Sequence, residues 1–158
     1  MATEIERKFL VRDTSVLVGL TGIRIAQGYL ANNGMVVRVR VAGDKGFLTL
    51  KGNTKGLSRA EFEYEVPLGD AEALLTGFAS LGRVEKIRYY IPVGDLTFEV
   101  DVFEKELSGL VVAEVEVPSE EHHVPQLVWL GTEVSRDFRY RNSELAISRT
   151  IPVYSPGT

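Results

Sequence analysis

The chain has 158 residues, and its 22 Asp and Glu residues outnumber its 18 Lys and Arg residues, which gives a formal net charge of −4. This charge gives no support to nonspecific binding of nucleic acid or of an anionic membrane. The sequence contains no cysteine, which excludes disulfides, zinc–thiolate sites and cysteine nucleophiles.

The length predicts about one domain, which we expect to cover residues 1–152, followed by a loose tail at residues 153–158. The first residues, MATEIERKFLV, carry charges where a signal peptide has an apolar run. No segment approaches the ~20 consecutive apolar residues of a membrane span. We therefore expect a cytoplasmic protein that has no membrane or nucleic-acid partner.

Runs in which apolar and polar residues alternate predict about eight strands, bounded by turn signals such as Asn33-Gly34 and Gly94-Asp95. Several connections are too short for crossovers, so most neighbouring strands should be antiparallel. The predicted strands are Thr3–Val11, Ile23–Leu30, Met35–Val41, Phe47–Lys51, Arg59–Val66, Val84–Ile91, Thr97–Phe103 and Leu110–Val117. The loop at Gly52–Gly56 is interpreted as a flexible hairpin end.

Helices are predicted at three places. The first covers Asp70–Leu81, with Asp70 as N-cap and Gly82 as C-cap. A second short helix is expected within Ser119–Leu130, where Trp129 is interpreted as a packing residue. A third begins near Asn142 and stops before Pro152.

The charged residues of the predicted strands share one face of the sheet, because side chains at alternate positions point the same way. Their apolar neighbours face the opposite side. The charged positions are Glu4, Glu6, Lys8, Arg38, Arg40, Lys51, Arg59, Glu61, Glu63, Glu65, Lys86, Arg88, Glu99, Asp101, Glu114 and Glu116.

An antiparallel sheet often leaves one face in solvent, and for any single strand that interpretation is adequate. Here, however, like charges recur two residues apart within a strand, as in Arg38 and Arg40 or Glu114 and Glu116. Such pairs repel unless a group of opposite charge lies between them. A polyanion would satisfy the cations and divalent metal ions would satisfy the carboxylates, so the pattern indicates a metal–polyphosphate ligand.

The available ligands narrow the choice of metal. Carboxylates on neighbouring strands offer hard oxygen donors, which suit Mg²⁺ or Mn²⁺. The adjacent His122 and His123 lie in a hydrophilic stretch and are interpreted as solvated residues rather than metal ligands.

The charged motifs and their order resemble those of the CYTH superfamily, whose members are also called triphosphate tunnel metalloenzymes. Within this superfamily, the sequence resembles the small bacterial-type inorganic triphosphatases. EIERKFL resembles the ExExK signature, and it is followed in the family's order by VRVR, LTLK, SRAEFE, EKIRY, FEVDVF, VAEVEV and DFRYRNSELA. The resemblance implies a mainly β fold: an eight-stranded antiparallel β-barrel that forms a tunnel with an ionic interior and a few covering helices.

The resemblance also implies roles for individual residues. Triphosphate-binding residues would be Lys8, Arg38, Arg40, Lys51, Arg59, Lys86, Arg88 and Arg139. Metal-binding residues would be Glu4, Glu6, Asp101, Glu114 and Glu116, and tunnel-lining residues would be Glu61, Glu63 and Tyr29. Lys86, Glu4, Glu6 and Arg40 would carry the catalysis.

One position departs from the family pattern. Phe138 stands where a basic residue usually precedes the Arg-Tyr pair. Arg136 or Arg141 is a candidate to replace the missing charge.

The implied activity is hydrolysis of linear tripolyphosphate to pyrophosphate and phosphate, with Mg²⁺ or Mn²⁺ as cofactor and a monomer or homodimer as the working unit. Three alternatives remain open at this point. Two are other activities of the same fold, an adenylate cyclase and a thiamine triphosphatase. The third is a noncatalytic module that binds polyphosphate or nucleotide.

Overall fold

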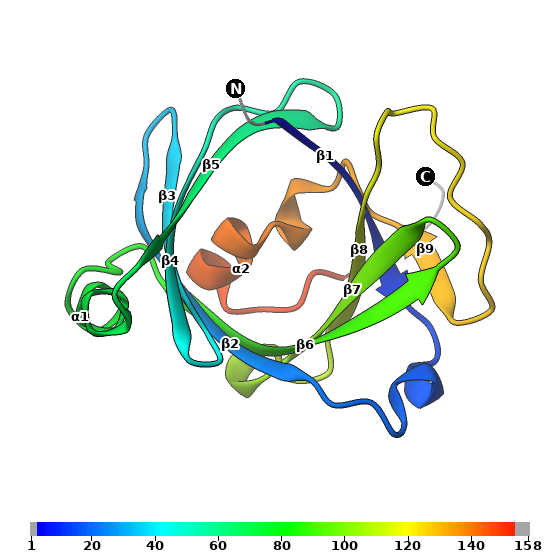
Figure 1. Ribbon diagram of the computed structural model, residues 1–158, viewed down its shortest axis with the longest axis horizontal. Helices are drawn as coiled ribbons and strands as arrows, with labels where there is room; N and C mark the ends of the chain where they lie inside the picture. Colours follow the sequence, from blue (N-terminus) through cyan, green and yellow to red (C-terminus); the bar gives the residue numbers. More distant parts are fainter. Residues whose placement is uncertain (1–2, 154–158) are drawn as a thin grey trace.

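The computed structural model describes residues 3–153 (Figure 1). This part of the chain forms nine strands, two α-helices and three short 3-10 helices. The strands are β1 (Thr3–Val11), β2 (Ile23–Asn32), β3 (Val36–Ala42), β4 (Lys45–Lys51), β5 (Ser58–Val66), β6 (Arg83–Val93), β7 (Leu96–Phe103), β8 (Val111–Glu116) and β9 (Leu130–Glu133). The helices are η1 (Thr14–Leu17), α1 (Leu68–Gly77), η2 (Lys105–Leu107), η3 (Phe138–Tyr140) and α2 (Asn142–Ser148).

Eight of these strands close into a ring. Their order is β5-β4-β3-β2-β6-β7-β8-β1, and every neighbouring pair is antiparallel. The ring closes because β1 also pairs with β5, with Thr3 opposite Ala60 and Glu4 opposite Arg59. This confirms the expected eight-stranded antiparallel barrel, and Figure 1 looks along its axis.

The alternation of residues along each strand puts charge inside the ring and apolar side chains outside. On β3, Arg38 and Arg40 line the interior, whereas Val39 between them is fully buried against Ala71 and Leu75 of α1. Two larger apolar clusters cover other parts of the outer surface. The hydrophobic core therefore lies between the ring and its covering segments, and the tunnel is left to polar groups.

Helix α1 differs at both ends from the predicted range 70–81. It begins after Pro67, whose φ of −55° suits a helix start, so the prediction of Asp70 as N-cap is wrong. Asp70 instead lies in the first turn, where a negative charge is favourable. The helix ends at Gly77, well before the predicted C-cap Gly82.

The predicted helix within 119–130 is absent from this described segment, which forms turns and irregular chain before β9. Pro125 in its middle would remove a helical hydrogen bond and clash with the preceding turn. Apolar contacts hold the segment instead. The Trp129 and Phe98 rings pack edge to face, with their centres 5.4 Å apart. The packing role of Trp129 is thus confirmed, whereas β9 and η1 were not predicted.

Helix α2 begins at Asn142 as predicted and lies across one end of the ring, where Figure 1 shows it through the opening. It ends at Ser148, and the C-cap residue Arg149 adopts a left-handed conformation with φ of 56°. Neither α-helix in residues 3–153 has the length and apolar character needed to cross a membrane. The predicted loose tail at 153–158 lies outside the described residues except for Val153, which is exposed.

Candidate active site

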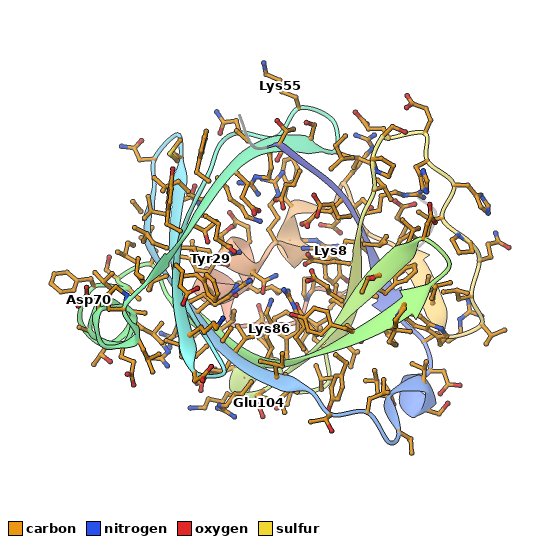
Figure 2. The ribbon with its side chains drawn as sticks, viewed as in Figure 1. Lys8, Tyr29, Lys55, Asp70, Lys86 and Glu104 are labelled. Carbon is orange, nitrogen blue, oxygen red and sulfur yellow. The ribbon has the colours of Figure 1, made fainter. Side chains whose placement is uncertain are left out.

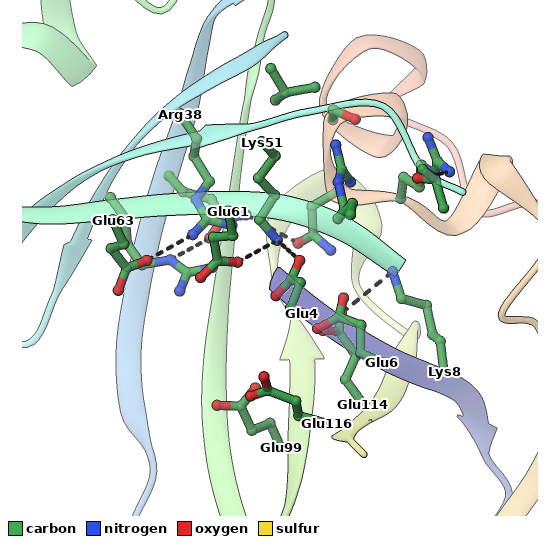
Figure 3. A pocket seen from close by; sticks show the side chains of 18 of the residues that line it. Glu4, Glu6, Lys8, Arg38, Lys51, Glu61, Glu63, Glu99, Glu114 and Glu116 are labelled. Atoms are coloured by element: carbon green, nitrogen blue, oxygen red, sulfur yellow. Dashed lines mark hydrogen bonds and ion pairs between the residues drawn. The ribbon is translucent and has the colours of Figure 1, made fainter. Parts of the chain in front are cut away.

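A cavity of about 250 Å³ lies inside the ring, and every ring strand contributes to its lining. Figures 2 and 3 show side chains from several strands pointing into this common space. The cationic lining residues are Lys8, Arg38, Arg40, Lys51, Arg59, Lys86, Arg88 and Arg141, and the acidic ones are Glu4, Glu6, Glu61, Glu63, Glu99, Glu114 and Glu116. The ring thus brings together residues that are more than 100 positions apart in the sequence.

Most of the cations already have a carboxylate partner. Lys51 contacts Glu4 at 2.8 Å and Glu61 at 3.3 Å (Figure 3). Two further pairs, Lys8 with Glu114 and Arg38 with Glu63, have N–O distances of 3.4 and 3.3 Å. These pairs neutralise much of the charge inside the tunnel.

The deepest ion-pair network is centred on Asp101. Its carboxylate contacts the ammonium of Lys86 at 2.7 Å and accepts two hydrogen bonds from Arg88, of 2.7 and 2.9 Å. Burial by itself raises the pKa of Asp101, but these two cations hold it below its usual value. The carboxylate therefore remains ionised and fully engaged by the two cations.

Lys86 is only 1% exposed, and this burial lowers its pKa to about 7. Asp101 opposes the shift, while Arg88 and Arg40 add to it. An ammonium group with a pKa near neutrality can gain or lose a proton at physiological pH. The structure therefore gives Lys86 the property that an acid–base residue needs.

Three lining cations have no carboxylate partner within residues 3–153: Arg40, Arg59 and Arg141. Arg40 donates from Nε to the amide oxygen of Gln27 at 2.8 Å, and Arg38 keeps its buried Nε without any hydrogen-bond partner in that range. Burial and the neighbouring Arg38 and Arg88 lower the pKa of Arg40 to about 10. Buried, unneutralised guanidinium groups indicate a place for an anion.

Two lining carboxylates lack a cationic partner in the same described range, Glu6 and Glu116. They lie opposite each other across β1 and β8, and Glu114 lies near both (Figure 3). Burial, followed by the charge of Glu114, raises the pKa of Glu6 to about 7. Burial and the charge of Glu6 likewise raise the pKa of Glu4 to about 8. Crowded carboxylates of this kind are stabilised when a cation lies between them.

These oxygen donors fit a hard divalent cation, although residues 3–153 contain no ready-made group of three metal-binding side chains. Asp101 differs from the other expected metal ligands, because it is absent from the lining and is engaged by Lys86 and Arg88.

The C-terminal arginines are placed differently from one another. Arg139, expected to bind triphosphate, does not line the cavity, and its guanidinium pairs with Asp137 at 2.7 Å. Arg136 is exposed and lies 3.6 Å from Glu120. Arg141 alone among these three lines the cavity.

Sequence reasoning missed two amide residues at the site, Gln27 and Asn142. Gln27 is fully buried, and it hydrogen-bonds Arg40, the hydroxyl of Tyr29 and the side chain of Asn142. The sequence could have indicated Gln27, because it lies two residues before Tyr29 and therefore on the same strand face. Asn142 had been identified only as the start of a helix.

Comparison with known proteins gives consistent matches over most of the chain. A family model described as the CYTH domain matches residues 2–149. An inorganic triphosphatase of Acetivibrio thermocellus is 42% identical over 146 residues, covering 92% of this chain and 94% of the relative. An inorganic triphosphatase of Nitrosomonas europaea is 43% identical over 154 residues, covering 92% of this chain and 98% of the relative.

Solved structures match as well. A crystal structure of an inorganic triphosphatase has a TM-score of 0.67 and 37% identity, and the match covers 97% of this chain and 99% of that one. A Hippeastrum protein described as an adenylyl cyclase with a dominant triphosphatase activity has a TM-score of 0.56 over 75% of this chain and 81% of that one. At 17% identity, the second match shows a shared fold alone.

Proposed function

Because the chain belongs to the CYTH domain family, we propose that the protein is a metal-dependent inorganic triphosphatase. It hydrolyses linear tripolyphosphate to pyrophosphate and phosphate. Support comes above all from the tunnel, where unneutralised arginines and unneutralised carboxylates line one cavity. A polyphosphate that carries a divalent cation satisfies both sets at once.

The arginines bind and orient the substrate in this proposal. Arg40 and Arg38 lie on one strand face, and both offer guanidinium N–H groups that no carboxylate fully occupies. Guanidinium groups match phosphate oxygens in geometry and charge. Placed before the reaction begins, they stabilise the charge that develops on the transferring phosphoryl group.

Lys86 acts as the general acid in this proposal. Water attacks the terminal phosphorus in line, the bond from that phosphorus to the bridging oxygen breaks, and the ammonium of Lys86 gives a proton to the departing pyrophosphate. The pKa of about 7 allows Lys86 to donate this proton and then to recover it from solvent. Its ion-pair partner Asp101 and its hydrogen-bond acceptor Asn142 fix the direction of the ammonium group.

Among the carboxylates, Glu6 and Glu116 are the first candidates to hold Mg²⁺ or Mn²⁺, with Glu4 and Glu114 beside them. A divalent ion bound there would supply Lewis-acid neutralisation of the phosphate oxygens. Glu61 and Glu63 hold Lys51 and Arg38 in place at the tunnel wall.

The small inorganic substrate is favoured over a nucleotide or thiamine triphosphate by the composition of the cavity wall. Among the described lining residues, Tyr29 is the one aromatic side chain, and its hydroxyl is bound to Gln27. A base or a thiazolium ring would need a stacking surface. The cavity, of about 250 Å³, offers phosphate-binding groups rather than such a surface.

The eight strands that line the cavity form one closed ring within the chain, and the proposal applies equally to a monomer or a homodimer. The proposed compartment is the cytoplasm.

The test is a phosphate-release panel with tripolyphosphate, ATP and thiamine triphosphate, each without metal and with Mg²⁺ or Mn²⁺. We expect rapid, metal-dependent release from tripolyphosphate and slow release from the other two. Preference for ATP or thiamine triphosphate would assign one of the other activities of the fold. Binding of tripolyphosphate without release under any condition would contradict the enzyme and identify a binding module.

A further inference from the structure

Thr49 is an uncharged residue on the inner face of β4. It lies two residues before Lys51, so both side chains belong to the same strand face, yet Thr49 is fully buried and does not line the cavity. The register places it directly between Arg38 on β3 and Glu63 on β5. Any effect of Thr49 on the tunnel therefore acts through these two charged neighbours.

The three side chains form a closed triangle of hydrogen bonds. Nη2 of Arg38 donates to the hydroxyl of Thr49 at 3.1 Å and to Oε2 of Glu63 at 3.3 Å. The Thr49 hydroxyl donates to the same Oε2 at 3.0 Å. Figure 3 shows the side chains of Arg38 and Glu63 pointing toward each other. Thr49 thus contacts both members of an ion pair from the strand that lies between them.

The direction of these hydrogen bonds follows from the chemistry of the groups. A guanidinium group only donates, and an ionised carboxylate only accepts. A hydroxyl group does both, so that of Thr49 accepts from Arg38 and gives its proton to Glu63. A valine has the same shape but can do neither. A carboxylate in this position would accept from Arg38 but would also cancel its charge.

The triangle determines which part of the Arg38 guanidinium group is left for a ligand. Nη2 has two acceptors, whereas the buried Nε has no hydrogen-bond partner within residues 3–153. Arg38 is itself buried and lines the cavity. A buried donor without a partner costs free energy until a ligand accepts from it. Because Nη2 is anchored, the unoccupied donor is held in one direction.

The other arginine of β3 is oriented in a similar way, but from the opposite side. Arg40 donates from Nε to the amide oxygen of Gln27 on β2. On β4, the residue opposite Arg40 is Phe47, whose side chain has no acceptor. Each arginine of β3 therefore has one uncharged side-chain acceptor on a neighbouring strand. Thr49 is to Arg38 what Gln27 is to Arg40.

We propose that Thr49 is a positioning residue for Arg38: its hydroxyl anchors Nη2 and thereby keeps the other donors of the guanidinium group directed at a phosphate oxygen of the substrate. This proposal rests on the proposed function and adds to it a residue that touches neither substrate nor metal. A guanidinium group that is oriented before the substrate arrives loses less freedom on binding. Thr49 thus raises catalytic efficiency without carrying charge.

The first test removes the hydroxyl and keeps the shape of the side chain. We expect Thr49→Val to lower kcat/KM for tripolyphosphate about tenfold, and Thr49→Ser, which keeps the hydroxyl, to stay within about threefold of wild type. Thr97→Val, at an exposed threonine of β7 outside the cavity, is the matched control and should be unchanged. Thr49→Ala is a second variant without the hydroxyl, for use if Thr49→Val does not fold.

A double-mutant cycle distinguishes positioning from a merely structural role. Acting through Arg38, Thr49→Val should lower kcat/KM about tenfold in wild type but less than twofold in an Arg38→Ala background. A structural role would lower it by the same factor in both backgrounds, and that result would overturn the proposal. So would wild-type kinetics of folded Thr49→Val, or an equal loss in Thr49→Ser.

A binding measurement separates this proposal from the proposed function. In calorimetric titrations with a chelator present, tripolyphosphate should bind Thr49→Val about tenfold more weakly than wild type or Thr97→Val. If wild type bound tripolyphosphate without hydrolysing it, the proposed function would fail, and weaker binding by Thr49→Val would still support the positioning role. Equal affinities in all three proteins would reject the positioning role alone.

Discussion

The side-chain oxygen of Asn142, the first residue of α2, accepts a 2.8 Å hydrogen bond from the ammonium of Lys86. The same oxygen lies 3.3 Å from the amide nitrogen of Gln27, whose own oxygen accepts from Arg40. The helix across the end of the tunnel is therefore connected to two cations of the site. Docking of α2 and placement of these cations depend on each other.

Asn142→Ala removes one of the two oxygen acceptors of Lys86, and we expect kcat to fall about tenfold with little change in KM. Asn142→Asp places a second carboxylate beside Lys86, which should raise the pKa of the lysine and move the pH–rate profile to higher pH. The profile of kcat between about pH 6 and pH 9 measures both effects. Ile147→Ala, an exposed position on the same helix, is the control. An Asn142→Ala profile that matches wild type would contradict this role.

Gln27→Glu tests whether Arg40 must remain unneutralised. The substitution puts a carboxylate against the Nε of Arg40, where the amide oxygen now lies at 2.8 Å. The new ion pair should compete with phosphate, so we expect KM for tripolyphosphate to rise about tenfold. Steady-state kinetics of Gln27→Glu and Gln27→Leu separate neutralisation from misorientation. A Gln27→Glu protein with wild-type KM would show that Arg40 does not contact the substrate.

Lys86→Ala should reduce kcat about a hundredfold or more, because both a proton donor and a preorganised charge are lost. It also leaves the buried Asp101 with Arg88 as its one remaining cation among the described residues, so the protein should be less stable by a few kcal/mol. Urea unfolding establishes that the variant is folded at the assay temperature. Lys105→Ala, at an exposed lysine outside the cavity, is the matched control. Normal turnover in folded Lys86→Ala would remove Lys86 from the mechanism.

Gly82→Ala should displace α2. Gly82 has a φ of +106°, and a Cβ atom there would collide with the backbone oxygen of Ala146 in α2. We expect a loss of about 1–3 kcal/mol in the free energy of unfolding, together with reduced kcat, because Asn142 would move with the helix. Gly69→Ala on α1, where the new methyl group meets nothing within 4 Å, should be neutral or slightly stabilising. Equal stability of the two variants would argue against the close packing of α2 on Gly82.

The metal-free protein should lose stability as the pH rises from about 5 to about 7. Glu4 and Glu6 have folded-state pKa values of about 8 and about 7, above the ordinary 4.5, so the folded state holds more protons than the unfolded state in this range. Such groups stabilise the fold at low pH, and the stabilisation is lost as the pH approaches the folded-state pKa. Lys86 does not oppose this trend, because its effect begins above pH 7.

Unfolding temperatures measured in a chelator across this range provide the check. Added Mg²⁺ should stabilise the protein more at pH 7 than at pH 5, since the ion competes with protons for the carboxylates. Glu6→Gln should flatten the pH dependence. A metal-free protein whose stability rises steadily from pH 5 to pH 7 would contradict the raised pKa values.

The strand pattern was available from the sequence because a strand has a period of two. Val39 between Arg38 and Arg40 already indicated one apolar and one ionic face, and the structure confirms both. The ends of the helices were harder to predict from the sequence, because they depend on local features such as the helix start after Pro67. The irregular segment before β9 is held by the contact of Trp129 with Phe98, which joins distant parts of the chain.

The sequence by itself determined which residues are charged, in which order the motifs follow, and that each strand has an ionic face. Only the tertiary structure decided that this face is the inside, because the β1–β5 pairing closes the ring and the apolar faces pack outward. It also decided which charges neutralise each other. Ion pairing depends on which side chains the folded chain brings within reach of one another. Arg141 therefore lines the cavity whereas Arg139 pairs with Asp137 outside it. For the same reason Asp101 forms ion pairs with Lys86 and Arg88.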